Sequence, residues 1–362
     1  MDKRTVNQYP FTAIVNQEEM KKTLLLNAVN PNIGGVLIRG TSGTAKSTAV
    51  RGLLALLPDI KVVKGCPFNC DPHSLKNLCS LCQRKIQQGE KLPVATRRRK
   101  LVNLPLNATE DRVAGSLDIS RALKEGDKSF EPGLLADAHR GILYIDEINL
   151  LDDQIIDILL DAAALGVNIV EREGISFAHP SRFLLIGTMN PEEGELRPQI
   201  ADRIGLQIEI AGIEKINERV EVLKRYDKFL EDPDGFLRNY ASSEQGLQDN
   251  IQRAIDLLPK ISMAKELYEV IARLTAYFKV ASHRADITIS QCARSLAALE
   301  GEQKVKETHI KEAAFLSLGH RVKKDPFEAE PPLEHRDVER QLEKILDTMP
   351  GEKKTSLKPG SY

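Results

Sequence analysis

The segment VLIRGTSGTAKSTAVRGLLALL at residues 36–57 constrains the fold of this chain more than any other feature. It starts with an apolar run typical of a buried strand and continues with a loop of small residues. From Lys46 onward, apolar residues recur at helical spacing, so the segment predicts a strand, a loop and a helix in that order. The loop nearly matches the pattern G-x-x-x-x-G-K-[ST], which is typical of a site for a nucleoside triphosphate.

In such a segment the backbone N–H groups of the loop and of the first helical turn point at phosphate oxygens, and the helix dipole favours negative charge there. We expect the nucleotide to be bound by Gly40, Thr41, Ser42, Gly43, Thr44, Ala45, Lys46, Ser47 and Thr48. Lys46 is expected to reach the β and γ phosphates of ATP. Ser47 is expected to bind Mg²⁺ through its hydroxyl oxygen.

Ala45 departs from the pattern, because a second glycine is expected at its position. The loop keeps its shape only if Ala45 has a negative φ or if neighbouring residues fix its conformation. A plainer interpretation of the whole segment is a glycine-rich turn before an ordinary helix. The Lys46–Ser47 pair and the strand-loop-helix context weigh against that interpretation.

The composition of the chain is that of a globular protein, with 362 residues, 41% hydrophobic and 28% charged, and leaves room for two domains with real cores. The formal net charge of −1 gives no global electrostatic reason to expect nucleic acid or a membrane as the partner. No apolar run approaches the ~20 residues that a membrane helix needs. Because the N-terminus also lacks the apolar core of a signal peptide, we expect a cytoplasmic location.

Strands alternate with helices across residues 30–212, which predicts a parallel α/β sheet with helices on both faces. We expect strands at 60–63, 100–104, 142–145, 183–186 and 206–210, a loop and a helix across 110–124, a helix at 134–138, and a hairpin at 168–178. Helical periodicity then dominates at 249–257, 262–279, 288–299 and 307–319. We therefore divide the chain into an α/β nucleotide-binding domain at 1–212 with an insertion at about 65–100, an all-helical domain at 213–321, and a charged tail at 322–362 with one exposed helix at 335–347.

An acidic pair, Asp146 and Glu147, follows the buried strand at 142–145. Such a pair is a weak signal alone, but about a hundred residues after a phosphate loop it indicates a nucleotide hydrolysis site. We assign Asp146 to Mg²⁺, and Glu147 to the attacking water as general base or water-orienting group. Asn190 ends the next strand, where its amide would reach the γ-phosphate or the water. An Asx turn before Pro191 is the alternative role for Asn190, and both roles can hold.

ATP hydrolysis gains from a cation aimed at the charge of the transition state, and a neighbouring subunit can supply that cation. The candidates are Arg197, Arg203, Arg284 and Arg294. Spacing alone does not choose among them.

Four cysteines lie within the insertion, Cys66, Cys70, Cys79 and Cys82, in the spacing C-x3-C-x8-C-x2-C. Four thiolates this close together predict a tetrahedral Zn²⁺ site or an iron–sulfur cluster. A thiol redox switch and ordinary reduced cysteines are the alternatives. We interpret His73, which lies between the cysteines, as a bystander, and the fifth cysteine, Cys292, as buried packing in a helix.

Five segments carry a resemblance to a known family: GTSGTAKST, EDRVAGSLDI, GILYIDEINLLDD, VEREGISFAHPSRF and GTMNPEEGELRPQIADRIGL. From residue 10 to about 320 the chain resembles the ATPase subunit of magnesium chelatase, in the AAA+ superfamily. The resemblance implies an AAA+ P-loop domain with a parallel sheet, followed by an all-α lid that is displaced in this branch. It also implies a ring, expected to be a hexamer, with ATP between subunits, and a hairpin before the first sensor that matches residues 168–178.

The resemblance also implies roles for particular residues. Lys46 and Ser47 match the Walker A motif, and Asp146 and Glu147 match Walker B. Asn190 matches the first sensor, and Arg203 in ADRIG resembles the arginine finger, which acts on ATP held by the adjacent subunit. Arg284 in SHRADI resembles the second sensor, with Arg294 as the runner-up, and Arg197 is expected to brace the interface.

A motor subunit of this kind would hydrolyse ATP for a chelatase that inserts magnesium or cobalt into a tetrapyrrole. Its implied partners are further copies in a homo-oligomeric ring, a second AAA+ subunit with a von Willebrand-type domain, and a large tetrapyrrole-binding subunit. Nucleic acid and membranes are not expected as partners. Ala45 and the cysteines depart from the typical chlorophyll-pathway subunit and leave the inserted metal open, with a cobalt chelatase branch as one possibility.

Two other classes of function remain as alternatives. One is an AAA+ chaperone of the related MoxR group, which would remodel proteins or help metal centres to form. The other is a DNA-remodelling ring, against which the near-neutral charge weighs.

Overall fold

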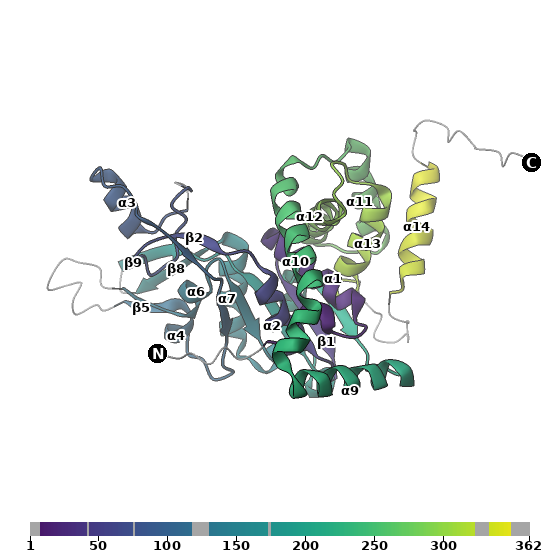
Figure 1. Cartoon of the computed structure of the whole chain (residues 1–362). Helices are drawn as coiled ribbons and strands as arrows, with labels where there is room; N and C mark the ends of the chain where they lie inside the picture. The colour runs from purple at the N-terminus through teal and green to yellow at the C-terminus, as the bar shows by residue number, and fades with distance from the viewer. Residues whose placement is uncertain are drawn as a thin grey trace, which may run out of the picture.

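The computed structural model describes residues 8–41, 43–74, 77–117, 130–172, 175–322 and 333–348. Figure 1 shows an α/β part built around a sheet and a group of helices beside it. The chain passes into the helical group after the last strand of the sheet, at residue 210.

Five strands form the central sheet, in the order β11, β1, β10, β7 and β4. Their bounds are Leu206–Ile210, Val36–Gly40, Leu184–Met189, Ile142–Ile145 and Leu101–Asn103. All neighbouring strands of this sheet pair in parallel. The predicted parallel sheet is therefore confirmed, and β7 and β11 begin and end at the predicted residues.

Side chains of β1 alternate between two hydrophobic cores on opposite faces of the sheet. Val36 and Ile38 belong to one core, and Leu37 belongs to the other. Because successive strand residues point to opposite faces, an uninterrupted apolar run needs helices on both sides. Those helices include α1, α2 and α7, at Glu18–Val29, Lys46–Leu56 and Asp153–Leu165.

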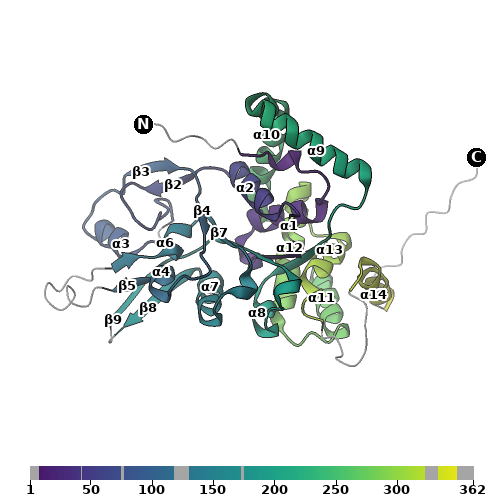
Figure 2. The same cartoon turned by 90° about the horizontal axis from the view of Figure 1, so that it is seen from below.

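Among the described residues, three antiparallel strand pairs lie outside the central sheet. They are β2 with β3 (Ile60–Val63, Val94–Arg97), β5 with β6 (Gly115–Leu117, Phe130–Pro132) and β8 with β9 (Val167–Arg172, Ile175–Pro180). The predicted hairpin is confirmed as β8–β9, although residues 173 and 174 lie outside the described residues. In Figures 1 and 2 this hairpin lies at the end of the α/β part that is remote from the helical group.

The structure refines two predictions for this region. The strand predicted at 60–63 is confirmed as β2, but it pairs antiparallel with β3 of the insertion and lies outside the parallel sheet. Within the loop and helix predicted across 110–124, the described residues form α4 (Glu110–Ala114) and then β5, which begins at Gly115 with a φ of +98°. Residues 118–124 lie outside the described residues. The insertion also contains α3 (Ser80–Gln87), whereas α6 (Leu134–Ala138) has the predicted bounds.

In the described residues after 212, the helical group contains α9 (Ile216–Glu231), α10 (Pro233–Leu257), α11 (Lys265–Tyr277), α12 (His283–Glu300), α13 (Glu307–Leu318) and α14 (His335–Thr348). The helix predicted at 249–257 is the last third of α10. Asp232 caps its start by accepting a hydrogen bond from the N–H of Gly235 at 2.8 Å. An Asp followed by Pro is a helix start signal that the hydrophobic period alone does not reveal. No helix in the described parts of the chain combines the length and the apolar character needed to cross a membrane.

The sequence predicts an exposed helix at 335–347, but one face of helix α14 is buried. Val338, Leu342 and Ile345 recur at helical spacing and are buried. They face α11 and α13, and Lys311 of α13 pairs with Glu339 at 2.7 Å. The apolar stripe therefore attaches residues 335–348 to the helical group.

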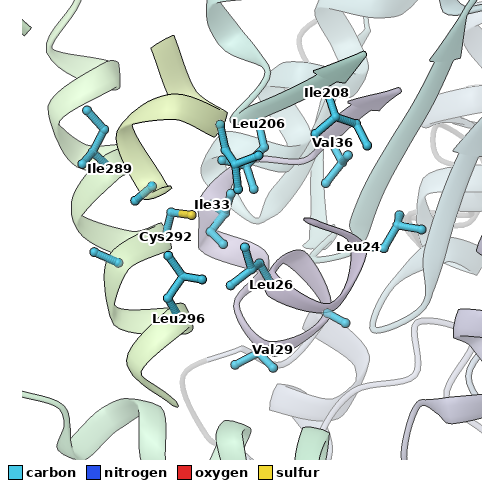
Figure 3. Packing of buried hydrophobic residues seen from close by; sticks show 14 of the residues in the cluster. Leu24, Leu26, Val29, Ile33, Val36, Leu206, Ile208, Ile289, Cys292 and Leu296 are labelled. Carbon is cyan, nitrogen blue, oxygen red and sulfur yellow. The ribbon is translucent and has the colours of Figure 1, made fainter. Parts of the chain in front are cut away.

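Helix α12 packs against the α/β part through α1. Figure 3 shows Ile289, Cys292 and Leu296 of α12 beside Leu26 and Val29 of α1. Cys292 is fully buried in this contact, which confirms the packing role predicted for it. One continuous hydrophobic core therefore holds the helical group against the sheet.

Candidate nucleotide-binding site

The carboxyl ends of three adjacent strands meet at one cavity. In the sheet, β10 lies between β1 and β7, so the segments that follow these strands become neighbours. The cavity has a volume of about 360 Å³, within the usual range for a ligand pocket. It is lined by Gly43, Thr44, Ala45, Lys46, Ser47, Thr48, Tyr144, Asp146, Glu147, Thr188, Met189 and Asn190. Topology thus brings together the loop, the acidic pair and the asparagine.

Lys46 opens helix α2 and folds back over the loop. Its ammonium donates to the backbone carbonyls of Gly40 at 2.6 Å and Thr41 at 2.9 Å. Burial lowers the pKa of Lys46, and the carboxylates of Asp146 and Glu147 oppose that shift. The lysine therefore lies between the loop and the acidic pair, where its charge can meet phosphate oxygens. Ser42 lies outside the described residues.

The loop conformation requires unusual backbone angles at two positions. Gly43 has a φ of +83°, and Ala45 has a φ of +63° with a ψ of 19°. Ala45 is thus in the left-handed region, and the neighbouring residues must hold it there. A Cβ on Gly40 would lie 2.4 Å from the carbonyl oxygen of Ile210, so the close approach of β11 also requires that glycine.

Asp146 is oriented by two hydroxyl groups. Its Oδ1 atom accepts hydrogen bonds from Thr188 at 2.6 Å and from Tyr144 at 3.0 Å. Burial raises the pKa of Tyr144, so this phenol remains a donor at neutral pH. Our sequence interpretation missed both hydroxyls. Their position at the carboxyl ends of β7 and β10 is the signal that would have found them.

Glu147 and Asn190 face the same cavity. Glu147 has a φ of +56°, and its backbone N–H donates to the hydroxyl of Thr188 at 3.2 Å. The side-chain oxygen of Asn190 accepts from the N–H of Glu192 at 3.3 Å, which is the predicted Asx turn. Because that turn uses the oxygen, the Asn190 amide nitrogen is the end of the side chain suited to a ligand oxygen.

Arg203 and Arg284 lie away from this cavity, at the opposite edge of the sheet. Arg203 ends helix α8 (Pro198–Arg203) just before β11, and the N–H of Gly205 bonds to the carbonyl of Gly34, which precedes β1. This is the amino edge of the parallel strands, whereas the phosphate loop is at the carboxyl edge. Arg284 lies near the same place, because its guanidinium pairs with Asp202 at 3.3 Å.

Ion pairs hold these arginines in place. Arg203 pairs with Asp157 at 2.6 Å and also with Asp161, both on α7. Arg197 pairs with Asp153 at 2.5 Å. Arg294 instead donates to the carbonyl of Ile261 and to the Tyr268 hydroxyl, within the helical group. Neither Arg203 nor Arg284 is brought to the nucleotide cavity of its own chain.

The residues at the cavity fit a magnesium complex of ATP. Asp146 and Ser47 offer the oxygen ligands that Mg²⁺ prefers, and both line the cavity. The N-terminus of the 11-residue helix α2 and the Lys46 ammonium provide positive potential for phosphate.

A second cluster of polar side chains lies in the insertion. The sulfur atoms of Cys66, Cys70, Cys79 and Cys82 all lie within 4.8 Å of one another, and all four side chains are buried. The spacing predicted this grouping. His73 is exposed and lies outside the group, in agreement with its interpretation as a bystander.

Known proteins match this chain over most of its length. Residues 116–204 match the model of magnesium chelatase, subunit ChlI, and residues 268–345 match the model of an AAA lid domain. A magnesium-chelatase subunit ChlI homolog from Methanocaldococcus jannaschii is 55% identical over 320 residues, which are 88% of this chain and 87% of the relative. The chloroplastic subunit ChlI of Nicotiana tabacum is 48% identical over 321 residues, covering 89% of this chain and 75% of that protein.

A solved structure supports the same assignment. A chain from a cryo-EM study of the complex between subunits BchI and BchD of magnesium chelatase is 43% identical, with a TM-score of 0.52. The match covers 92% of this chain and 99% of that one. With its parallel sheet and helical lid, the chain has the fold of an AAA+ ATPase and belongs to the magnesium chelatase subunit ChlI family.

Proposed function

We propose that the chain is the ATP-hydrolysing motor subunit of a metal chelatase, which inserts magnesium or cobalt into a tetrapyrrole. The observation that carries the proposal is the meeting of Lys46, Asp146 and Glu147 at one cavity. This arrangement occurs in a chain of the ChlI family, with relatives that are 55% and 48% identical over 88% and 89% of its length. The family relationship favours this function over a MoxR-type chaperone and over a DNA-remodelling ring.

The side chains of the cavity divide the work of hydrolysis. Lys46 binds the β and γ phosphates, and Ser47 and Asp146 hold Mg²⁺, which when bound neutralises charge on the phosphates. Glu147 takes the proton of the attacking water or orients that water, and Asn190 holds the water or the γ-phosphate. Thr188 and Tyr144 keep the Asp146 carboxylate in one orientation through their hydrogen bonds.

Substitution of Glu147 tests this division. Glu147→Gln keeps the shape of the side chain and removes its basicity, so the variant should bind ATP but should not turn it over. Lys46→Ala should lose nucleotide binding. Turnover at the wild-type rate in Glu147→Gln would contradict the role of this residue.

The two arginines at the far edge of the sheet support an assembly in which sites are shared between subunits. Arg203 and Arg284 cannot serve the nucleotide of their own chain from that edge, but in a ring that edge can face the cavity of a neighbour. We infer that Arg203 acts as the arginine finger and Arg284 as the second sensor, both on the ATP of an adjacent subunit, with Arg197 bracing the interface. A closed hexamer is the ring that we propose.

The motor would act on other subunits. One solved relative was studied as a complex of BchI with BchD, which supports a second chelatase subunit as a partner. We propose that this partner is an AAA+ subunit with a von Willebrand-type domain. A large tetrapyrrole-binding subunit would carry out insertion. ATP binding would close ring interfaces and hydrolysis would open them, so work is transmitted by differential affinity for the partners' states.

Reconstitution tests the chelatase function and identifies the metal. The purified chain is combined with the second and large subunits, and either Mg²⁺ or Co²⁺ is offered with its tetrapyrrole. We expect insertion of one of these ions that requires ATP and is lost with Lys46→Ala. ATP turnover without insertion of either metal in the complete mixture would contradict the chelatase function and favour the chaperone alternative.

The cysteine cluster suggests a second bound group. We propose that Cys66, Cys70, Cys79 and Cys82 bind Zn²⁺ or an iron–sulfur cluster, because four buried sulfurs converge on one point. This group would be structural, since the cluster belongs to the insertion and not to the nucleotide cavity.

A further inference from the structure

The four sulfurs of the insertion lie at the spacing of ligands around one ion. The Sγ atoms of Cys66 and Cys79 are 3.7 Å apart. A tetrahedral ion with metal–sulfur bonds of about 2.3 Å separates its sulfurs by about 3.8 Å, because a tetrahedron's edge is about 1.6 times its centre-to-corner distance. An iron–sulfur cluster attaches its thiolates to different irons and spreads them further. Because no two of the four sulfurs are more than 4.8 Å apart, their spacing favours a single ion over a cluster.

The local backbone is shaped to hold the sulfurs in this arrangement. Gly65 and Asn69 have φ values of +81° and +48°, so the chain turns sharply just before Cys66 and again just before Cys70. The backbone N–H of Cys79 donates to the Sγ atom of Cys70 at 3.2 Å. An N–H group aimed at a sulfur stabilises a thiolate, as the outer hydrogen bonds of metal sites generally do.

The opposite side of the same loop packs against hairpin β8–β9 and the strand pair β5–β6. Phe68 lies midway between Cys66 and Cys70 and is 1% exposed. Its ring stacks on His179 of β9 at a centroid distance of 4.7 Å, and Phe177 lies 5.9 Å away. Phe177 in turn stacks on Phe130 of β6 at 4.1 Å. The four cysteines, Phe68 and Phe177 belong to one buried hydrophobic cluster, and Phe130 packs against it.

Arg140 ties this loop to the α/β part on a third side. Its guanidinium donates to the carbonyl of Asn69 at 3.5 Å and to the carboxylate of Asp71 at 3.2 Å. These residues flank Cys70, so a positive charge lies beside a site whose four thiolates and one divalent ion would carry a charge of −2.

We propose that the four cysteines bind one Zn²⁺ ion, releasing their four thiol protons to solvent, and that this ion fixes Phe68 against hairpin β8–β9. The inference rests on the metal site proposed above and narrows it to a single ion with a structural consequence. The insertion has few apolar residues of its own, so metal binding supplies free energy that its packing cannot. Zinc content would then control the order of the hairpin.

Metal analysis of the purified full chain tests the first half of the proposal. We expect about one zinc per chain and neither iron nor acid-labile sulfide. Cys79→Ser and Cys82→Ser should lose the zinc, whereas Cys292→Ala should keep it, because Cys292 is buried in the helical group. Cobalt-substituted protein should show the visible absorption of tetrahedral thiolate-bound Co²⁺, which depends on the geometry and not on stability.

Each other outcome has a distinct meaning. Iron with sulfide would overturn the single-ion inference but keep a metal at the cysteines. Folded protein without metal would overturn both the single-ion inference and the metal site itself. Lys46→Ala should keep its zinc, so failure of the chelatase function and failure of the zinc site are separated by this variant.

Hydrogen exchange of the wild-type chain tests the second half. Removing zinc with a chelator should speed amide exchange about tenfold in residues 167–180, with exchange in α12 unchanged as an internal control. Phe68→Ala should retain zinc and still loosen the hairpin. Unchanged exchange in 167–180 after complete zinc removal would overturn the coupling between the ion and the hairpin.

Discussion

The guanidinium of Arg321 donates a hydrogen bond to the backbone carbonyl of Asp202 at 2.9 Å, and so joins the helical lid to the residue before Arg203. The Arg321 side chain is 1% exposed. Three further carbonyls accept from it at 2.7 to 3.0 Å, those of Ser317, Ile204 and Gly205. One buried cation therefore connects the lid to the helix that carries the proposed arginine finger.

Arg321→Met should uncouple these two elements. The variant leaves buried carbonyls without a donor, so we expect the free energy of unfolding to fall by about 2–4 kcal/mol. Arg336→Met is the matched control, because Arg336 is 86% exposed and its ion pair with Glu334 should contribute less than about 1 kcal/mol. Denaturant unfolding measures both values. Equal losses in the two variants would show that Arg321 does not hold this joint.

His320, beside Arg321, should make the joint sensitive to acid. Burial and then the charge of Arg321 lower the pKa of His320 to about 3, and its Nε2 donates to the carbonyl of Ile204 at 3.0 Å. The unfolded residue takes up a proton below pH 6.5, but the folded one does not until about pH 3. Its contribution to stability is therefore complete above pH 6.5 and declines as the pH falls toward 3.

The free energy of unfolding should therefore differ measurably between pH 7 and pH 5. Between pH 7 and pH 5, His320 should lower the free energy of unfolding by about 2 kcal/mol. His320→Gln keeps a donor for the Ile204 carbonyl but does not titrate. From pH 7 to pH 5 its free energy of unfolding should therefore fall by about 2 kcal/mol less than that of the wild type. Unfolding curves at both pH values for both proteins provide the comparison. Identical pH dependence would mean that His320 is protonated in the folded state.

Much of the fold followed from local patterns. The strand bounds at 142–145 and 206–210 could be predicted because a buried parallel strand is an unbroken apolar run between polar ends. The pairing of β2 with β3 could not be predicted, because Val94–Arg97 is mostly exposed and its sequence lacks the apolar pattern of a strand. The packing of α14 was also hidden, because its three buried residues lie in a segment of charged composition.

Thr188 should act as a positioning residue for Asp146. Thr188→Val keeps the shape of the side chain but removes the hydrogen bond to the carboxylate, and we expect ATP turnover to fall about 10- to 100-fold. Thr188→Ser restores the hydroxyl and should recover most of the activity. Steady-state ATPase assays measure kcat for both. A Thr188→Val variant as active as Thr188→Ser would contradict this role.

Ala45 should carry backbone strain at its φ of +63°. Ala45→Gly is expected to stabilise the chain by about 0.5–1 kcal/mol without loss of ATP turnover, because glycine adopts this conformation freely. The control is Ala49→Gly in the interior of α2, where glycine should destabilise by about 1 kcal/mol. Thermal unfolding of the two variants should therefore shift in opposite directions. A shift in the same direction would argue against strain at Ala45.

Most residues of the nucleotide cavity could be predicted from the sequence. The position of Arg203 and Arg284 at the opposite edge of the sheet could not. Lys46, Asp146 and Asn190 follow three strands, and the rule that parallel strands share a carboxyl edge places them together. The position of Arg203 and Arg284 at the opposite edge depends on the lid and on Asp202, which are tertiary contacts. The orienting hydroxyl of Thr188 was missed because a threonine inside a buried strand reads as packing.

Mixing two inactive variants tests the central claim most directly, namely that ATP is hydrolysed at a site shared between subunits. Lys46→Ala lacks the phosphate-binding lysine and Arg203→Ala lacks the proposed finger, so each alone should show almost no ATP turnover. In an equal mixture roughly a quarter of interfaces combine an intact Lys46 with an intact Arg203 from the neighbour, and turnover should return in proportion. Full activity of Arg203→Ala alone, or a mixture as inactive as its components, would contradict the shared site.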